Sequence, residues 1–295
     1  MNQEYFYFIS GLPNISFEDT KQVLTIEQFR IEAKTQLSAS DFSLLAIMHL
    51  PQDLDNLLAV LYKTKTGLNP EGLFAESDWE NYLAYLKAVM DNPRLECPAE
   101  FSALPQFVSD TISKVLNQED RQELIVTEQE LVEQFYAWAA KHHNQFIVQW
   151  FAYDAHLRNI LSAISGRKFN LPYAKYLVGK DETVDKLAKS HAADFGLGKA
   201  DELFEALTRI YEQNNILFRE KGYDVLRWKW IDNQNFFNYF NIDRILGYYC
   251  KLRILSRWLK ADPNLGKEVF HDTLDALQNS FSFPEDFNIK SVKKH

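Results

Sequence analysis

Positive charge is in deficit in this sequence of 295 residues, where 32 Lys and Arg stand against 41 Asp and Glu to give a formal net charge of -9. A general nucleic-acid binder needs a concentrated surplus of Lys and Arg to neutralise phosphates. We therefore expect no nucleic acid among the partners of this protein.

Cysteine is nearly absent, since only Cys97 and Cys250 occur, and neither has a second Cys or a His at metal-ligand spacing. This composition supports neither a disulfide framework nor a zinc site. Stability must then come from a core, and the chain is 46% hydrophobic with 22 Phe, 14 Tyr and 6 Trp.

Long hydrophobic runs are missing as well. The longest, 42–50 and 146–153, fall well short of the roughly 20 apolar residues that cross a bilayer. Near the start, Glu4 stands where a secretory signal has positive charge, and Gly11 and Pro13 stop the apolar run. We expect no export, and association with a membrane only through partners.

Glycine and proline are scarce, with 10 and 9 in all, and they stand mostly between segments of helical period. Such punctuation predicts an all-α fold, a multi-helix bundle with long helices. We expect one helical unit over 1–295 that divides, if at all, into lobes 1–125 and 126–295.

Capping residues predict the helix starts. Thr25 with Gln28 begins a helix over 26–36, and Ser38 with Asp41 begins the next. Further short helices are predicted over 56–66, 77–90, 183–190 and 263–280.

Three long helices are expected in the second half. Thr127 and Glu130 form a capping box, and no Gly or Pro follows until Gly166, which predicts one helix of about 60 Å. A second long helix is predicted from Asp201 toward Ile231, and a third over 243–259.

No catalytic constellation stands out. Asp194, Phe195 and Gly196 spell the kinase metal-binding tripeptide, but no glycine-rich loop or HRD loop precedes them. His271 and Asp272 form a pair of the kind that helical metal phosphohydrolases use, without the further ligands that such sites need. We therefore expect no metal, no cofactor and no catalysis, and keep a metal-dependent helical hydrolase as a minor alternative.

Two charged residues lie one turn apart on an otherwise apolar helix stripe, Asp154 and Arg158. Buried ion pairs add little net stability, so they are often kept for geometry or specificity. One interpretation is an internal bridge to Arg227 or Asp232 on a later helix, and the other is direct contact with a partner.

The helix over 243–259 is locally basic, with one acid, Asp243, in an otherwise acidic chain. Its basic side chains form either a solvated face or a docking surface for an acidic protein, and nearby tryptophans could anchor an interface. The predicted partner-binding residues are Asp154, Arg158, Arg227, Trp228, Trp230, Arg253, Arg257 and Trp258.

Several sequence blocks carry a family resemblance. They are YFYFISGLP at 5–13, DNLL at 55–58, WFAYDAHLRN at 150–159, DFGL at 194–197, VLRWKWID at 225–232 and FNIDRILGYYCKLRILSRW at 240–258. With these blocks the chain resembles a bacterial family of unassigned function that is encoded beside V-type ATPase subunits. More distantly it is similar to the funnel-shaped, all-helical C (or d) subunit of V-type and archaeal ATPases.

The resemblance implies a non-catalytic subunit of a V-type ATPase. In that role the protein couples the rotor shaft to the membrane proteolipid ring during ion transport, with the shaft and ring subunits as its partners. The expected location is cytoplasmic, peripheral to the inner face of the cell membrane. A helical adaptor or assembly factor for the same complex is the alternative.

Overall fold

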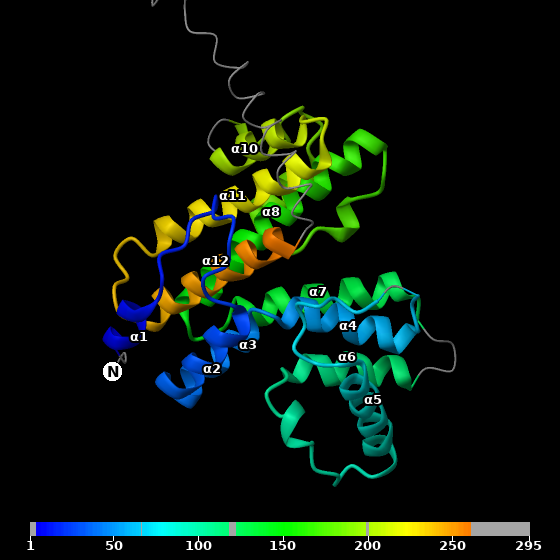
Figure 1. Ribbon diagram of the computed structural model, residues 1–295. Helices are drawn as coiled ribbons and strands as arrows, with labels where there is room; N and C mark the ends of the chain where they lie inside the picture. Colours follow the sequence, from blue (N-terminus) through cyan, green and yellow to red (C-terminus); the bar gives the residue numbers. More distant parts are fainter. Residues whose placement is uncertain (1–3, 66, 118–121, 199–200, 261–295) are drawn as a thin grey trace, which may run out of the picture.

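The computed structural model describes residues 4–65, 67–117, 122–198 and 201–260. In these ranges the chain forms twelve α-helices and two short 3-10 helices, with no strand (Figure 1). The predicted all-α fold of many helices is therefore confirmed. The helix predicted over 263–280, together with His271 and Asp272, lies outside the described residues.

Three helices lie near the N-terminus, and the last two of them start at the capping residues that the sequence predicts. They are α1 (Phe6–Gly11), α2 (Ile26–Gln36) and α3 (Ala39–Ile47). The Thr25 hydroxyl accepts from the Gln28 backbone N–H at 3.1 Å, and the Gln28 side chain accepts from the Thr25 N–H at 2.9 Å. This reciprocal pair satisfies two N–H groups that a helix start otherwise leaves open.

The next four helices pack together as a group. They are α4 (Leu50–Tyr62), α5 (Glu76–Asp91), α6 (Gln106–Leu116) and α7 (Leu124–Ala139). Both α4 and α6 pack against α5 and α7. Thr127 does not cap α7 as predicted, because it lies inside the helix, fully buried, with its hydroxyl 2.6 Å from that of Tyr62 on α4.

The predicted helix from Thr127 to Gly166 is two helices, because α8 (Gln145–Phe169) starts anew after α7. Asn144 caps α8 by accepting from the Ile147 N–H at 2.9 Å, and its amide donates to Asp243 at 2.8 Å. An asparagine can satisfy a helix start as well as Ser or Asp can. The break therefore needs neither Gly nor Pro.

Four further helices complete the described chain, and one of them also begins at an asparagine cap. They are α9 (Glu182–Lys189), α10 (Glu202–Tyr211), α11 (Ile216–Gln234) and α12 (Ile242–Lys260). The helix predicted from Asp201 to Ile231 breaks before α11, where Asn215 accepts from the Leu217 N–H at 2.8 Å. In contrast, α12 matches its predicted range to within one residue at each end.

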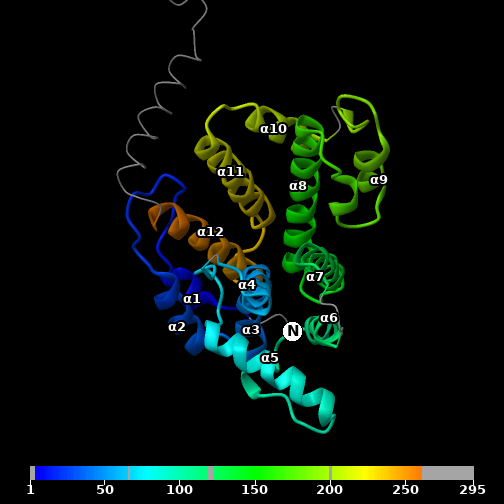
Figure 2. The same ribbon diagram turned by 90° about the vertical axis from the view of Figure 1, so that its right-hand side faces the viewer.

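Buried side chains form two clusters that meet on α8, the helix that runs from α7 toward α10 in Figure 2. The larger joins α1 through the start of α8 with α11 and α12, and includes Phe151. The smaller begins at Leu157 and lies between α8, α9, α10 and α11. The lobe boundary near residue 125 stays a prediction, and the buried clusters divide at a different place.

No single helix in the described ranges has the length and hydropathy of a membrane span. The helices α3 and α4, bent by 58° at their junction, reach the length and hydropathy of a span only when taken together.

Candidate functional site

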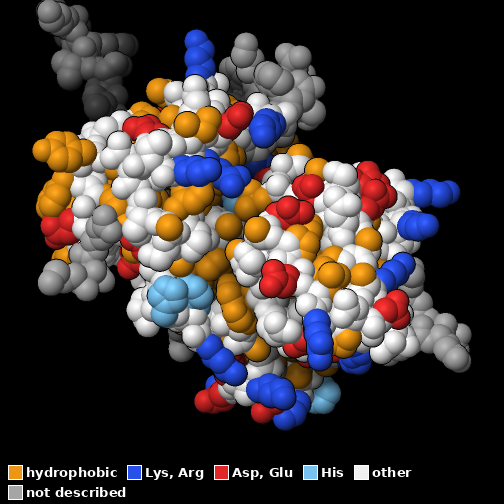
Figure 3. Space-filling model, turned by 90° about the horizontal axis from the view of Figure 1, so that it is seen from below, with side chains coloured by type: hydrophobic (Ala, Val, Ile, Leu, Met, Phe, Trp, Pro, Cys, Tyr) orange, Lys and Arg blue, Asp and Glu red, His pale blue; other side chains and the backbone are white. Residues whose placement is uncertain are grey.

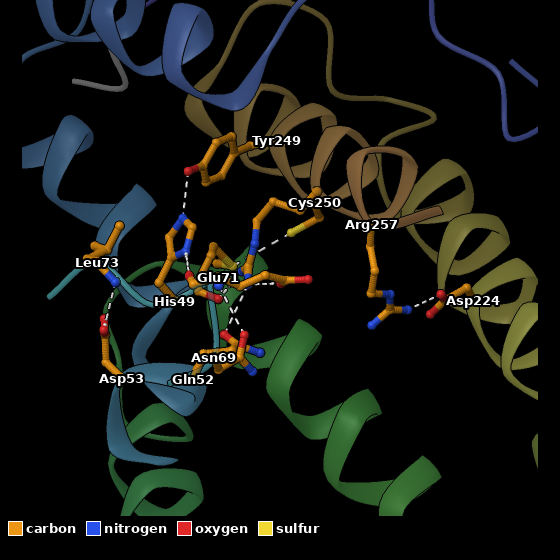
Figure 4. A network of polar contacts seen from close by, with 12 residues as sticks. His49, Gln52, Asp53, Asn69, Glu71, Leu73, Asp224, Tyr249, Cys250 and Arg257 are labelled. Carbon is orange, nitrogen blue, oxygen red and sulfur yellow. Dashed lines mark hydrogen bonds and ion pairs between the residues drawn. The ribbon is translucent and has the colours of Figure 1, made fainter. Parts of the chain in front are cut away.

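Asp224 in the middle of α11 is 1% exposed at its side chain, yet its carboxylate has three partners. One oxygen accepts from the Trp258 indole N–H at 2.8 Å and pairs with Arg257, and the other lies 3.3 Å from Nη1 of Arg227. Figure 4 shows the pairing with Arg257, which reaches across from α12. A buried carboxylate is tolerated only with such partners.

Arg227 connects Asp224 to a second carboxylate, Asp154 on α8. Nη2 of Arg227 lies 3.1 Å from Oδ1 of Asp154, and the Tyr136 hydroxyl on α7 donates to Oδ2 at 2.7 Å. Burial acts to lower the pKa of Arg227, but the charges of Asp154 and Asp224 outweigh it and raise that pKa. The six connected residues, called the Asp224 network below, are Tyr136, Asp154, Asp224, Arg227, Arg257 and Trp258.

The structure thus confirms the internal bridge for Asp154, with Arg227 as its partner. Asp232, the other candidate, pairs instead with Lys251 on α12. Arg158 is half-buried and makes no ion pair within 4.0 Å among the described residues. Contact of these side chains with a partner protein stays a prediction.

Arg253 also faces the interior. Its guanidinium lies 2.8 Å from Oε2 of Glu71, donates to the Gln52 amide oxygen at 3.0 Å and donates to the Met48 carbonyl. The same contacts bring the segment before α5 against α12 (Figure 4). Arg253 is therefore a bridge between the two halves of the chain.

His49 sits beside Arg253 and is 3% exposed. Its Nδ1 lies 2.6 Å from the Glu71 carbonyl and its Nε2 lies 2.6 Å from the Tyr249 hydroxyl. Burial, and then the Arg253 charge, lowers the pKa of His49 to about 3, so the ring is neutral. A neutral ring with its proton on Nδ1 donates to the carbonyl and accepts from Tyr249. We call His49, Gln52, Glu71, Tyr249 and Arg253 the His49 network.

Asp53 lies one turn beyond His49 and is also buried. Its Oδ1 accepts from the backbone N–H of Leu73 at 2.7 Å and, more weakly, from that of Phe74 at 3.4 Å. Burial raises the pKa of Asp53 to about 6, against the lowering effect of those hydrogen bonds. His49 and Asp53 thus both hold the segment before α5 in place.

The three tryptophans predicted as anchors also pack inside the chain. Trp228 is buried, with the Phe17 ring edge-on at 5.5 Å. Trp230 stacks on Tyr153 of α8 at 5.2 Å, and Trp258 donates to Asp224. Of the eight predicted partner-binding residues, Arg257 alone is exposed.

Sequence reasoning missed a group of exposed aromatic side chains on α1 and on the connection from α11 to α12. The group, called the aromatic end below, consists of Phe6 (48% exposed), Tyr7 (94%), Phe236 (70%), Phe237 (81%) and Tyr239 (64%). These segments lie together at the left of Figure 1, and hydrophobic side chains project at the same edge of Figure 3. The signal was the run NFFNYFN at 235–241, dense in rings where a helix connection should be polar.

Local contacts fix the aromatic end in place. The Tyr5 backbone N–H donates to the Phe240 carbonyl at 2.6 Å, and the rings of Phe6 and Phe240 lie 4.4 Å apart. The rings of Phe236 and Phe237 pack edge-on at 4.8 Å. These contacts join α1 to the hairpin of α11 and α12 across most of the chain length.

A pocket of about 440 Å³ opens beside these rings, and a smaller one of about 70 Å³ adjoins it. The larger is lined by Ile9, Ser10, Asp232, Asn235, Phe236, Asn238, Tyr239, Phe240 and Arg244. Asn235 and Arg244 line both pockets. The arrangement suits binding of an apolar group next to a polar one, the usual character of recognition pockets.

The described ranges contain no group of three or more His, Cys, Asp or Glu side chains placed to hold a metal ion. The hydrolase pair His271 and Asp272 lies beyond them.

A family model described as a protein of unknown function (DUF2764) matches residues 1–281. No curated protein and no solved structure matches this chain.

Proposed function

The chain belongs to the DUF2764 family, and we propose that it is a non-catalytic subunit of a V-type ATPase, joining the rotor shaft to the membrane proteolipid ring. The proposal starts from the sequence blocks that resemble a family encoded beside such subunits. The aromatic end is the structural observation that supports it best. In this proposal the aromatic end binds a neighbouring subunit.

Uncovered aromatic rings are the main argument for binding. The five rings of the aromatic end are 48–94% exposed and lie at one side of the folded molecule, beside a pocket. Contiguous apolar surface of this kind is rare on soluble monomers and marks sites where another molecule docks. Aromatic side chains also dominate the energetic centres of protein interfaces.

A stiff body is the second requirement for a protein that transmits torque, and the interior contacts support it. The Asp224 network links α7, α8, α11 and α12 by charged hydrogen bonds. The His49 network links the start of α4 to α12. Buried hydrogen-bonded networks specify one arrangement of the helices around them.

A helical adaptor or assembly factor would expose the same aromatic end, so the stage at which the chain is bound separates the two roles. The test is purification of the V-type ATPase from membranes of cells that express this chain. A constant stoichiometry in the active enzyme supports the role of a permanent subunit, and presence only in immature complexes supports the assembly factor. Absence from both would sink the proposal.

The docking site is tested by the same purification from cells that carry Phe236→Ser with Phe237→Ser. We expect the double variant to be lost from the complex. Phe169→Ser removes an aromatic ring of 62% exposure at the last residue of α8, away from the aromatic end (Figure 1), and serves as the matched control that should co-purify normally.

A further inference from the structure

The charges around the two adjoining pockets do not balance. Among the charged side chains that line them, Asp232 pairs with Lys251. Arg244 is exposed and makes no ion pair within 4.0 Å with any described residue. Asp232 therefore balances the charge of Lys251, and Arg244 leaves an excess positive charge at the wall common to both pockets.

The positive charges of Arg244 and Lys251 also repel each other. Burial lowers the pKa of Lys251, the hydrogen bond that Lys251 donates to Asp232 opposes this, and the charge of Arg244 adds to the lowering. Like charges held close together favour the approach of an anion. Arg244 offers a planar fork of donors, the geometry that best matches a carboxylate.

We propose that the aromatic end binds a protein segment in which an apolar side chain stands next to a carboxylate. The apolar side chain enters the larger pocket between Ile9, Phe236 and Tyr239, and the carboxylate pairs with Arg244 at its rim. This inference rests on the proposed function and names the chemistry of the partner that the site accepts.

A bilayer surface fits the same end less well. Lipid binding by exposed rings needs protruding side chains and several basic residues, and it makes no use of a cavity. Here a pocket of about 440 Å³ stands among the rings, and only one lining cation is unpaired. The shape and the single charge favour a side chain with a carboxylate neighbour.

The test is selection from a displayed library of random 12-residue peptides, with the full chain as bait. We expect enrichment of peptides that carry Asp or Glu within two positions of an aromatic or aliphatic residue. Arg244→Gln should remove the acidic preference and weaken binding of a selected peptide by about 2- to 5-fold, the upper range for an exposed charge pair. Replacing the peptide's Asp by Asn should have the same effect on the original chain and none on the variant.

Lys260→Gln is the matched control, since Lys260 is an exposed cation on the same helix at its opposite end. Selection of neutral or basic peptides, no selection at all, or binding only to vesicles with anionic lipid would overturn the inference. The ATPase purification is read separately. If the Arg244→Gln variant co-purifies normally while the Phe236 and Phe237 variant is lost, the docking role of the aromatic end is supported and the recognition of a carboxylate by Arg244 is contradicted.

Discussion

The two ends of the hairpin formed by α11 and α12 differ in which side chains they bury and which they expose. Toward one end, Asp224 and Arg227 turn inward and pair with each other, and Arg257 reaches in from the surface to Asp224. At the other end, Phe236 and Phe237 turn outward and are mostly exposed. The usual arrangement of apolar groups inside and charges outside is reversed at both ends.

This difference shows where binding capacity lies. Residue types common at interfaces, Arg and Trp, are engaged within the chain at the first end, whereas the aromatic end keeps its rings uncovered. We therefore expect changes in the Asp224 network to act on stability. Changes at the aromatic end should act on partner binding and leave stability nearly unaltered.

The largest effect should come from Asp224→Ala. It leaves Arg257 and the Trp258 indole without their acceptor and removes one of the two carboxylates around Arg227. Because Arg257 is half exposed, we expect a loss near the lower end for a broken buried pair, about 3 kcal/mol in the free energy of unfolding. Urea denaturation measures it.

Asp232→Asn is the control for that change, because its carboxylate is half exposed and pairs with Lys251 alone. The expected loss is about 0.5 kcal/mol. Equal losses for the two variants would contradict the distinction between a buried network and a surface pair.

Gly247→Ala tests the packing that connects the two ends. An added Cβ would lie 1.9 Å from Nδ2 of Asn235 and 3.0 Å from Cγ2 of Ile231, so α11 and α12 would have to separate. We expect a loss of about 2 kcal/mol by thermal denaturation. Gly67→Ala, with nothing within 4 Å, should change the midpoint little, and a similar loss there would show that the close approach is not the cause.

The interior also predicts opposed effects of pH from two neighbours. His49 has its pKa lowered from 6.5 to about 3, so its stabilising contribution is present above pH 6.5 and is lost as the pH falls. Asp53 has its pKa raised from 3.8 to about 6, so its contribution is present at low pH and is lost as the pH rises through 6. On acidification from pH 6.5 the two therefore oppose each other.

Single variants should separate these contributions. Between pH 6.5 and about pH 5, Asp53→Asn should lose about 1 kcal/mol on acidification, and His49→Gln should gain about as much. Urea denaturation at each pH gives the slopes. Parallel slopes in the two variants would show that one of the assigned pKa shifts is wrong.

The smallest effect on stability is expected at the aromatic end. Phe236→Ser with Phe237→Ser removes exposed rings, so the free energy of unfolding should change by less than about 0.5 kcal/mol for each substitution. A loss of several times that amount would mean that the rings stabilise the fold and are not free for a partner.

Sequence reasoning predicted the helices that local signals define, and missed what depends on distant residues. Thr25 and Gln28 set the start of α2 between themselves, and the apolar spacing of α12 gave its bounds. Asn144 and Asn215 broke the two predicted long helices because an asparagine cap is as effective as a more obvious signal.

The candidate site was harder to predict from the sequence than the helices were. The Asp154 bridge could be anticipated because a charge on an apolar stripe needs a partner. The exposure of Phe236 and Phe237 could not, because an aromatic run has the same pattern whether or not another helix covers it. Only the exposed fractions of the two rings in the folded chain, 70% and 81%, show that they stay open.

Hydrogen–deuterium exchange tests the central claim most directly. The full chain is measured alone and after addition of purified V-type ATPase that lacks it. The account predicts that backbone protection increases in residues 5–12 and 234–244, while α5 and α9 stay unchanged. Protection confined to α5, α9 or the other helices away from the aromatic end would contradict it, as would no protection anywhere in the chain.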